Sequence, residues 1–191
     1  MVEILERPRA PARHRLDVDA YYKMAEAGIL TRSDRVELID GEIIDMAAIG
    51  SPHAAIVNRL NRLLVPAVEG LALVSVQSPL RLDAYNEPEP DLMLLRPRPD
   101  DYRAGHPGAA DVLLLIEVSE SSLAYDQTAK LALYAKFGLA EVWIIDVSGA
   151  AIEVYREPAG EAYAQRERLT SGSLGPVLAP GVTIDVGALL K

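Results

Sequence analysis

Apolar and polar positions follow two different periods along this 191-residue chain, and these periods separate expected strands from expected helices. Residues 111–118 (DVLLLIEV) and 141–147 (EVWIIDV) are almost continuously apolar, which is typical of strands buried on both faces of a sheet. Residues 35–46 (RVELIDGEIIDM) hold two short apolar runs around Asp40-Gly41, a dipeptide that predicts a hairpin turn. Further strands are expected at 71–77, 79–83 and 91–95, in a second hairpin at 150–156 and 161–169, and around Val177 and 182–186.

Helical periodicity occurs in three places: from Asp17 to about Ala27, from Ser51 to about Val65 or Glu69, and from about Tyr125 to Phe137. Ser51 as an N-cap, followed by Pro52, is a good start signal for the second helix. Gly28 and Gly138 mark the ends of the other two. The element order, α-ββ-α-βββ-β-α-β-ββ, predicts an α/β or α+β fold with a central mixed β-sheet flanked by helices.

The length suits one domain, which we expect at 17–191, after a mobile Arg- and Pro-rich arm at 1–16. The net charge of −9 argues against a protein that coats nucleic acid by bulk charge, but it leaves room for a local basic strip. The absence of cysteine excludes disulfides, zinc–thiolate sites and a thiol nucleophile. Without a signal peptide or a membrane-length apolar run, we expect a cytoplasmic protein that does not bind membranes.

Two acidic residues are poorly placed for purely structural roles. Glu117 ends the most apolar strand and, by alternation, shares a face with Leu113 and Leu115. If the strand that begins at Asp91 is its antiparallel neighbour, with Leu95 opposite Leu113, then Asp91 lies opposite Glu117. Two carboxylates this close favour a divalent cation between them, and Mg²⁺ and Mn²⁺ prefer such oxygen ligands. The alternative is that both residues are strand ends that reach solvent.

Lys130 falls on one stripe of its expected helix with Asp126, Leu133 and Phe137. A lysine among large apolar side chains, on the helix directly after Glu117, is a candidate catalytic ammonium that orients an attacking water or stabilises a transition state. The alternative is a surface pair between Asp126 and Lys130, spaced i,i+4.

Two weaker candidates are Glu37, in the middle of a hairpin strand, and His53, in the first turn of the second helix. Their alternatives are an outward-facing strand residue and a capping or packed histidine. Other chemistries are excluded, because the sequence has no glycine-rich phosphate loop, no GxSxG elbow and no histidines at metal-binding spacing.

Pro90-Asp91, then Ile116-Glu117-Val118, then a lysine on the following helix resemble the PD-(D/E)XK nuclease superfamily. The usual motif lysine stands two residues after the glutamate, where this chain has Ser119, so the pattern is similar to branches whose lysine has moved to the next helix. A closer resemblance is to the Uma-two family of restriction-endonuclease-like bacterial proteins. It is carried by RVELIDGEII (35–44), SPHAAIVNRL (51–60), PEPDLMLL (88–95) and LLLIEVSESSLAYDQTAKLALYAKFGLAEVWIID (113–146).

The resemblance implies a restriction-endonuclease-like core and a metal-dependent endonuclease that acts on DNA. The implied catalytic cluster is Asp91, Glu117, Lys130 and Glu37, with His53 and Asp126 nearby. Asp91, Glu117 and the backbone carbonyl of Val118 would ligate Mg²⁺ or Mn²⁺.

Phosphate contacts are expected from arginines of the arm and of the loop at 96–110, namely Arg7, Arg9, Arg13, Arg15, Arg96, Arg98 and Arg103. A homodimer is expected because enzymes that cut duplexes often need two sites. Two alternatives stay open: a catalytically inactive binding module with this fold, and a metal-dependent hydrolase of small phosphoesters.

Overall fold

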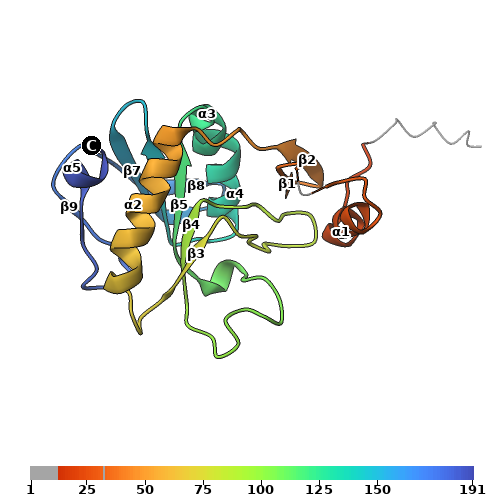
Figure 1. Cartoon of the computed structure of the whole chain (residues 1–191), viewed down its shortest axis with the longest axis horizontal. Coiled ribbons are helices and arrows are strands. Elements are labelled where there is room, and N and C mark those ends of the chain that lie inside the picture. Colours follow the sequence, from red (N-terminus) through yellow and green to blue (C-terminus); the bar gives the residue numbers. More distant parts are fainter. Residues whose placement is uncertain (1–12, 32) are drawn as a thin grey trace, which may run out of the picture.

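A six-stranded mixed β-sheet forms the centre of the computed structural model, which describes residues 13–31 and 33–191 (Figure 1). The strand order is β3-β4-β5-β6-β7-β8, in which β5 and β6 are parallel and all other neighbours are antiparallel. The strands are β3 (Leu73–Val76), β4 (Leu92–Leu95), β5 (Val112–Ser119), β6 (Glu141–Asp146), β7 (Ala151–Ala159) and β8 (Ala162–Leu169). The predicted fold class, a mixed sheet flanked by helices, is confirmed.

Helices cover both faces of this sheet and close two hydrophobic cores. On one face lie α2 (Ser51–Ala67) and the short α5 (Val186–Leu189), packed over β5 residues such as Ile116. On the other face lies the helix that follows β5, whose Tyr134 packs against Leu115. Because side chains alternate along β5, Glu117 points to the same face as Leu115.

The β4–β5 pairing has one irregularity that changes a predicted face. Leu94 pairs with Leu114, but Leu95 pairs with Val112, so Leu113 is the extra residue of a β-bulge. Its side chain packs in the core beneath α2. The prediction that Leu113 shares a face with Glu117 is therefore wrong, although the same prediction for Leu115 is confirmed.

The helix after β5 is not a regular α-helix. It consists of α3 (Leu123–Tyr125), a π-helical turn η2 (Asp126–Lys130) and α4 (Leu131–Lys136), so it begins two residues before the predicted Tyr125. Gly138 follows with a φ of +72°, as its predicted role at the helix end requires. A π-turn inside a helix often occurs at a functional site, and here it carries Lys130.

The N-terminal elements agree with the predictions. They are α1 (Val18–Glu26), capped by Asp17, and the hairpin β1 (Val36–Ile39) and β2 (Glu42–Asp45). Asp40 and Gly41 both have positive φ, at 51° and 74°, as the predicted hairpin turn requires. Residues 1–12 of the expected arm lie outside the described residues.

Two predicted strands are absent, and one helix boundary differs from the prediction. Residues 79–83 form no strand, because their amides bond to loop residues, for example Leu80 N to the Pro88 carbonyl and Arg81 N to the Pro107 carbonyl. Ser51 is the first helical residue rather than the cap, which is Gly50. Around Val177 the structure has no strand. The remaining short elements are η1 (Ala109–Asp111), β9 (Ser173–Leu174) and β10 (Ile184–Asp185). Across the described residues, no helix combines the length and the apolar character that a membrane span requires.

Candidate active site

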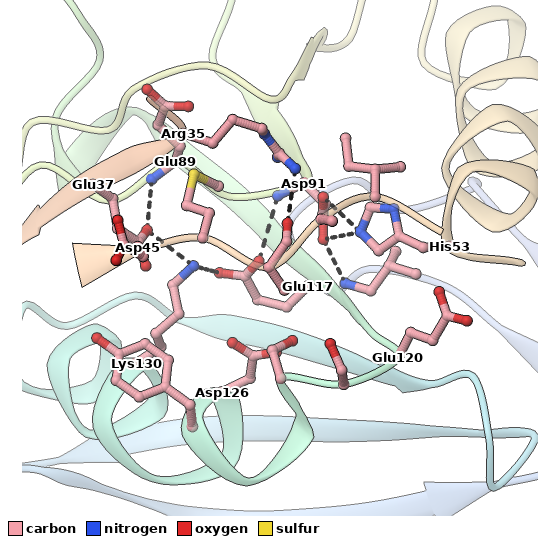
Figure 2. A pocket seen from close by; sticks show the side chains of 18 residues that line it. Arg35, Glu37, Asp45, His53, Glu89, Asp91, Glu117, Glu120, Asp126 and Lys130 are labelled. Carbon is pink, nitrogen blue, oxygen red and sulfur yellow. Dashed lines mark hydrogen bonds and ion pairs between the residues drawn. The ribbon is translucent and has the colours of Figure 1, made fainter. Parts of the chain in front are cut away.

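An acidic cleft opens where the β1–β2 hairpin, the start of α2, the start of β4, the end of β5 and the π-turn meet (Figure 2). Its walls carry seven carboxylates, on Glu37, Asp45, Glu89, Asp91, Glu117, Glu120 and Asp126. Of the residues that line it, all in the described part of the chain, only Arg35 and Lys130 have a permanent positive charge. The six predicted site residues all lie in this one cleft, although they come from five separate segments of the chain.

Strand register brings Asp91 beside Glu117. Leu92 pairs with Ile116, so the residue before β4 lies next to Glu117 near the end of β5. The Asp91 amide donates to Glu117 Oε2 over 3.4 Å. The predicted antiparallel pairing is confirmed for Leu92 to Leu94, and the bulge displaces only the far end, away from the cleft.

Three groups fix the Asp91 carboxylate. Val118 N donates to Asp91 Oδ2 over 2.9 Å, His53 Nε2 lies 3.0 Å away, and Gln77 Nε2 donates to Oδ1 over 3.3 Å. Burial alone would raise the pKa of Asp91, but the hydrogen bonds from His53 and Val118 outweigh it and hold that pKa below its ordinary value. Asp91 is therefore ionised at neutral pH.

His53 belongs to this arrangement as a donor rather than as a helix cap. Its hydrogen bond to Asp91 raises the pKa of the imidazole, against the effect of burial. The other ring nitrogen, Nδ1, is buried and has no hydrogen-bond partner among the described residues. The hydrogen bond of His53 Nε2 therefore orients the Asp91 carboxylate.

Lys130 lies between two buried carboxylates. Its Nζ is 2.9 Å from Glu117 Oε1 and 3.2 Å from Glu37 Oε2, and only 5% of its side chain is exposed. Tyr134 also donates to Glu117 Oε1, over 2.5 Å, and the Glu89 amide donates to Glu37 Oε2 over 3.1 Å. Lys130 and Tyr134 stand one helical turn apart and therefore hold the same oxygen atom.

The buried charges shift one another's ionisation. Burial raises the pKa of Glu117 above its ordinary value, although the Lys130 ammonium and the Tyr134 hydroxyl act in the opposite direction and favour the carboxylate. Burial alone would lower the pKa of Lys130, but Glu117 and Glu37 outweigh it and raise that pKa above its ordinary value. Lys130 is accordingly a permanent cation inside the protein.

Ser119 occupies the usual position of the motif lysine and has a different partner. Its Oγ donates to Asp126 Oδ2 over 2.7 Å, and Ser122 Oγ donates to the same atom over 2.5 Å. Asp126 therefore ties the π-turn to the end of β5. The alternative of a surface pair between Asp126 and Lys130 is wrong, because both side chains are buried and Lys130 bonds to Glu37 and Glu117 instead.

The structure adds residues that sequence reasoning missed. Tyr134 could have been found from its i,i+4 spacing to Lys130, whereas Gln77 and Arg35 reach the cleft through loop and hairpin geometry that leaves no sequence signal. Of the arginines predicted to bind phosphate, Arg7 and Arg9 lie outside the described residues. The other five do not line the cleft. Three form exposed or partly exposed ion pairs: Arg13 with Glu42, Arg15 with Asp40, and Arg98 with Asp100.

The donor set fits a divalent cation. Within the described ranges, no group of three or more histidine, cysteine or acidic side chains converges as a closed metal cage. Mg²⁺ does not need one, because it binds through one or two carboxylates and keeps waters and substrate phosphate as its other ligands. Val118 N–H donates to Asp91, and since a strand residue turns its N–H and C=O to the same side, the Val118 carbonyl points to the β4 side of β5 as well.

Comparisons with known proteins give the family and the fold. The Uma2 family model, described as "Putative restriction endonuclease", matches residues 18–187. Among solved structures, the fold is similar to that of a putative nuclease belonging to DUF820 from Anabaena variabilis, with a TM-score of 0.70 and 17% sequence identity. That match covers 92% of this chain and 97% of the other. No curated protein matches the sequence. At this identity the structural match establishes the shared fold.

Proposed function

We propose, from the premise that the chain belongs to the Uma2 family of putative restriction endonucleases, that it is a divalent-metal-dependent endonuclease that hydrolyses phosphodiester bonds in DNA. The observation that carries the proposal is the position of Lys130 beside Glu117, with Asp91 on the other side of Glu117 (Figure 2). Two acids and a buried ammonium in one cleft are the groups that phosphodiester hydrolysis needs.

Asp91, Glu117 and the Val118 carbonyl would hold Mg²⁺ or Mn²⁺. When bound, the cation supplies neutralisation of the scissile phosphate and a lowered pKa for a water nucleophile. Asp91 is prepared for this role because His53, Val118 and Gln77 keep its carboxylate ionised and oriented. Glu117 would bind the cation through Oε2, which accepts the long 3.4 Å hydrogen bond from the Asp91 amide, because Oε1 is taken by Lys130 and Tyr134.

Lys130 would act on the substrate through its fixed positive charge. Its ammonium orients the attacking water and stabilises negative charge that develops on the phosphate oxygens. Glu37 keeps the ammonium protonated and aimed into the cleft, and Asp126 holds the π-turn from which Lys130 projects. Lys130 would thereby replace the lysine that this chain lacks at Ser119.

The test is a cleavage assay with purified protein and Mg²⁺ or Mn²⁺ on plasmid DNA, single-stranded DNA, RNA and a small phosphodiester. We expect cleavage of DNA that depends on the cation and is lost on chelation. Cleavage of the small phosphodiester alone would favour a small-molecule hydrolase instead. A protein that takes up Mn²⁺ and cleaves none of the four would favour the inactive binding module.

A further inference from the structure

Arg35 precedes β1 and lines the mouth of the acidic cleft, opposite the helix that carries Lys130 (Figure 2). Its guanidinium is fixed at the tip, because Nη1 donates to the Ala47 carbonyl over 2.8 Å. Its backbone is fixed as well, because its own carbonyl accepts a hydrogen bond from Met46 N over 2.8 Å. The side chain is therefore held in one place before any ligand arrives.

The Arg35 charge is not neutralised by an acidic partner. Within the described residues the guanidinium forms no ion pair, and the contact to Ala47 is its only hydrogen bond. This is unusual in a cleft with seven carboxylates, and it differs from Lys130, whose charge is shared between Glu37 and Glu117. Nε and Nη2 of Arg35 remain available as donors.

A phosphodiester that approaches this cleft meets a strongly negative surface, so it needs a cation at the entrance as well as inside. A guanidinium suits this task, because its planar fork binds two oxygens of one phosphate at once. We propose that Arg35 binds a backbone phosphate of the substrate at the mouth of the cleft and so positions the neighbouring phosphodiester for cleavage. This inference rests on the proposed nuclease function and names a substrate-binding residue for it.

The test compares Arg35→Gln with Arg62→Gln, since Arg62 is exposed on α2 and does not line the cleft. Binding of a fluorescein-labelled DNA duplex is measured by anisotropy over a range of salt concentrations, with Ca²⁺ in place of Mn²⁺ and the DNA checked for intactness. Arg35→Gln should bind about 10- to 100-fold more weakly, as expected for a lost hydrogen-bonded charge contact. Its slope of log affinity against log salt should fall by about one phosphate equivalent.

Two further readouts separate substrate binding from a purely structural role. The stabilisation of Arg35→Gln by Mn²⁺ should equal that of the wild type, because the metal ligands are unchanged. Arg35→Lys, which keeps the charge but not the fork, should retain the wild-type salt slope and lose several-fold in affinity. This variant also serves if Arg35→Gln does not fold, and wild-type affinity in Arg35→Lys would then overturn the inference.

The outcomes distinguish this inference from the proposed function. If the wild type binds and cleaves DNA while Arg35→Gln keeps both affinity and salt slope, Arg35 only anchors the segment at Ala47 and the inference is wrong. If the wild type neither binds nor cleaves any nucleic acid, the proposed function itself fails and the inference fails with it.

Discussion

The ammonium of Lys130 lies 2.9 Å from the carboxylate of Glu117, and only 5% and 4% of these two side chains are exposed. A buried ion pair is a poor source of stability, because desolvation of both charges offsets their attraction. It is, however, a good means of placing charge inside a reactive cleft. The burial of this pair is therefore better explained by a functional role of Lys130 than by a contribution to stability.

Lys130→Met tests this directly. The substitution keeps most of the side-chain volume and removes the charge, so the rate of DNA cleavage should fall by about 10²- to 10³-fold. The apo protein should also lose roughly 3–5 kcal/mol of stability, because Glu37 and Glu117 are left buried without their cation. Cleavage kinetics and thermal melting measure the two effects.

The matched control is Lys136→Met, because Lys136 lies exposed at the end of α4, outside the cleft. It should keep wild-type rate and stability. Equal cleavage by the two variants would show that Lys130 has no catalytic role.

Asp91→Asn tests the metal site. The melting temperature of the wild type should rise with Mn²⁺ by mass action, and this increase should be absent in the variant. The apo variant should lose about 1–3 kcal/mol, because an amide cannot accept hydrogen bonds at both positions now bonded to Val118, His53 and Gln77. Repulsion between the carboxylates of Asp91 and Glu117, taken alone, would instead make the apo variant more stable than the wild type. A variant that still gains the full wild-type increment with Mn²⁺ would show that Asp91 is not a ligand.

Tyr134→Phe tests the support of Glu117. It removes only the hydroxyl that donates to Oε1 over 2.5 Å, a bond to a charged group that contributes about 1.5–3 kcal/mol. We expect a comparable loss of stability and a rate reduced roughly tenfold, because Glu117 is then held by Lys130 alone. Tyr163→Phe is the control, since the Tyr163 hydroxyl donates to the Leu139 carbonyl outside the cleft. It should lose stability without loss of rate, and a similar loss of rate in both variants would refute a specific role for Tyr134.

The sequence predicts the central part of the site because two simple periodicities determine it. Alternation in β4 and β5 places Asp91 beside Glu117, and the helical stripe turns Lys130 toward the sheet. The bulge at Leu113 escapes prediction because it lies in a run of leucines, where every register looks equally apolar.

Features that depend on loops also escape prediction. The loop at 79–83 has the composition of a strand, but its amides bond to the return segment at 86–88 and to Pro107 rather than to a neighbouring strand. The contact of Arg35 with the Ala47 carbonyl depends on the path between β2 and α2, which no periodicity describes. Sequence reasoning therefore located the acids and the lysine, and it missed the arginine at the entrance.

The position of the lysine gives the last prediction. Ser119 and Glu117 share a face of β5, and Ser119 bonds to Asp126. A lysine at 119 would therefore find a carboxylate partner beside the same cleft. In the Lys130→Met background, Ser119→Lys should recover part of the lost cleavage rate, because a cation returns to the position that the superfamily motif uses. Ser119→Met in that background is the control for size and should recover nothing. A folded Ser119→Lys double variant that keeps its Mn²⁺ stabilisation but stays as slow as the Ser119→Met control would show that the two positions are not interchangeable.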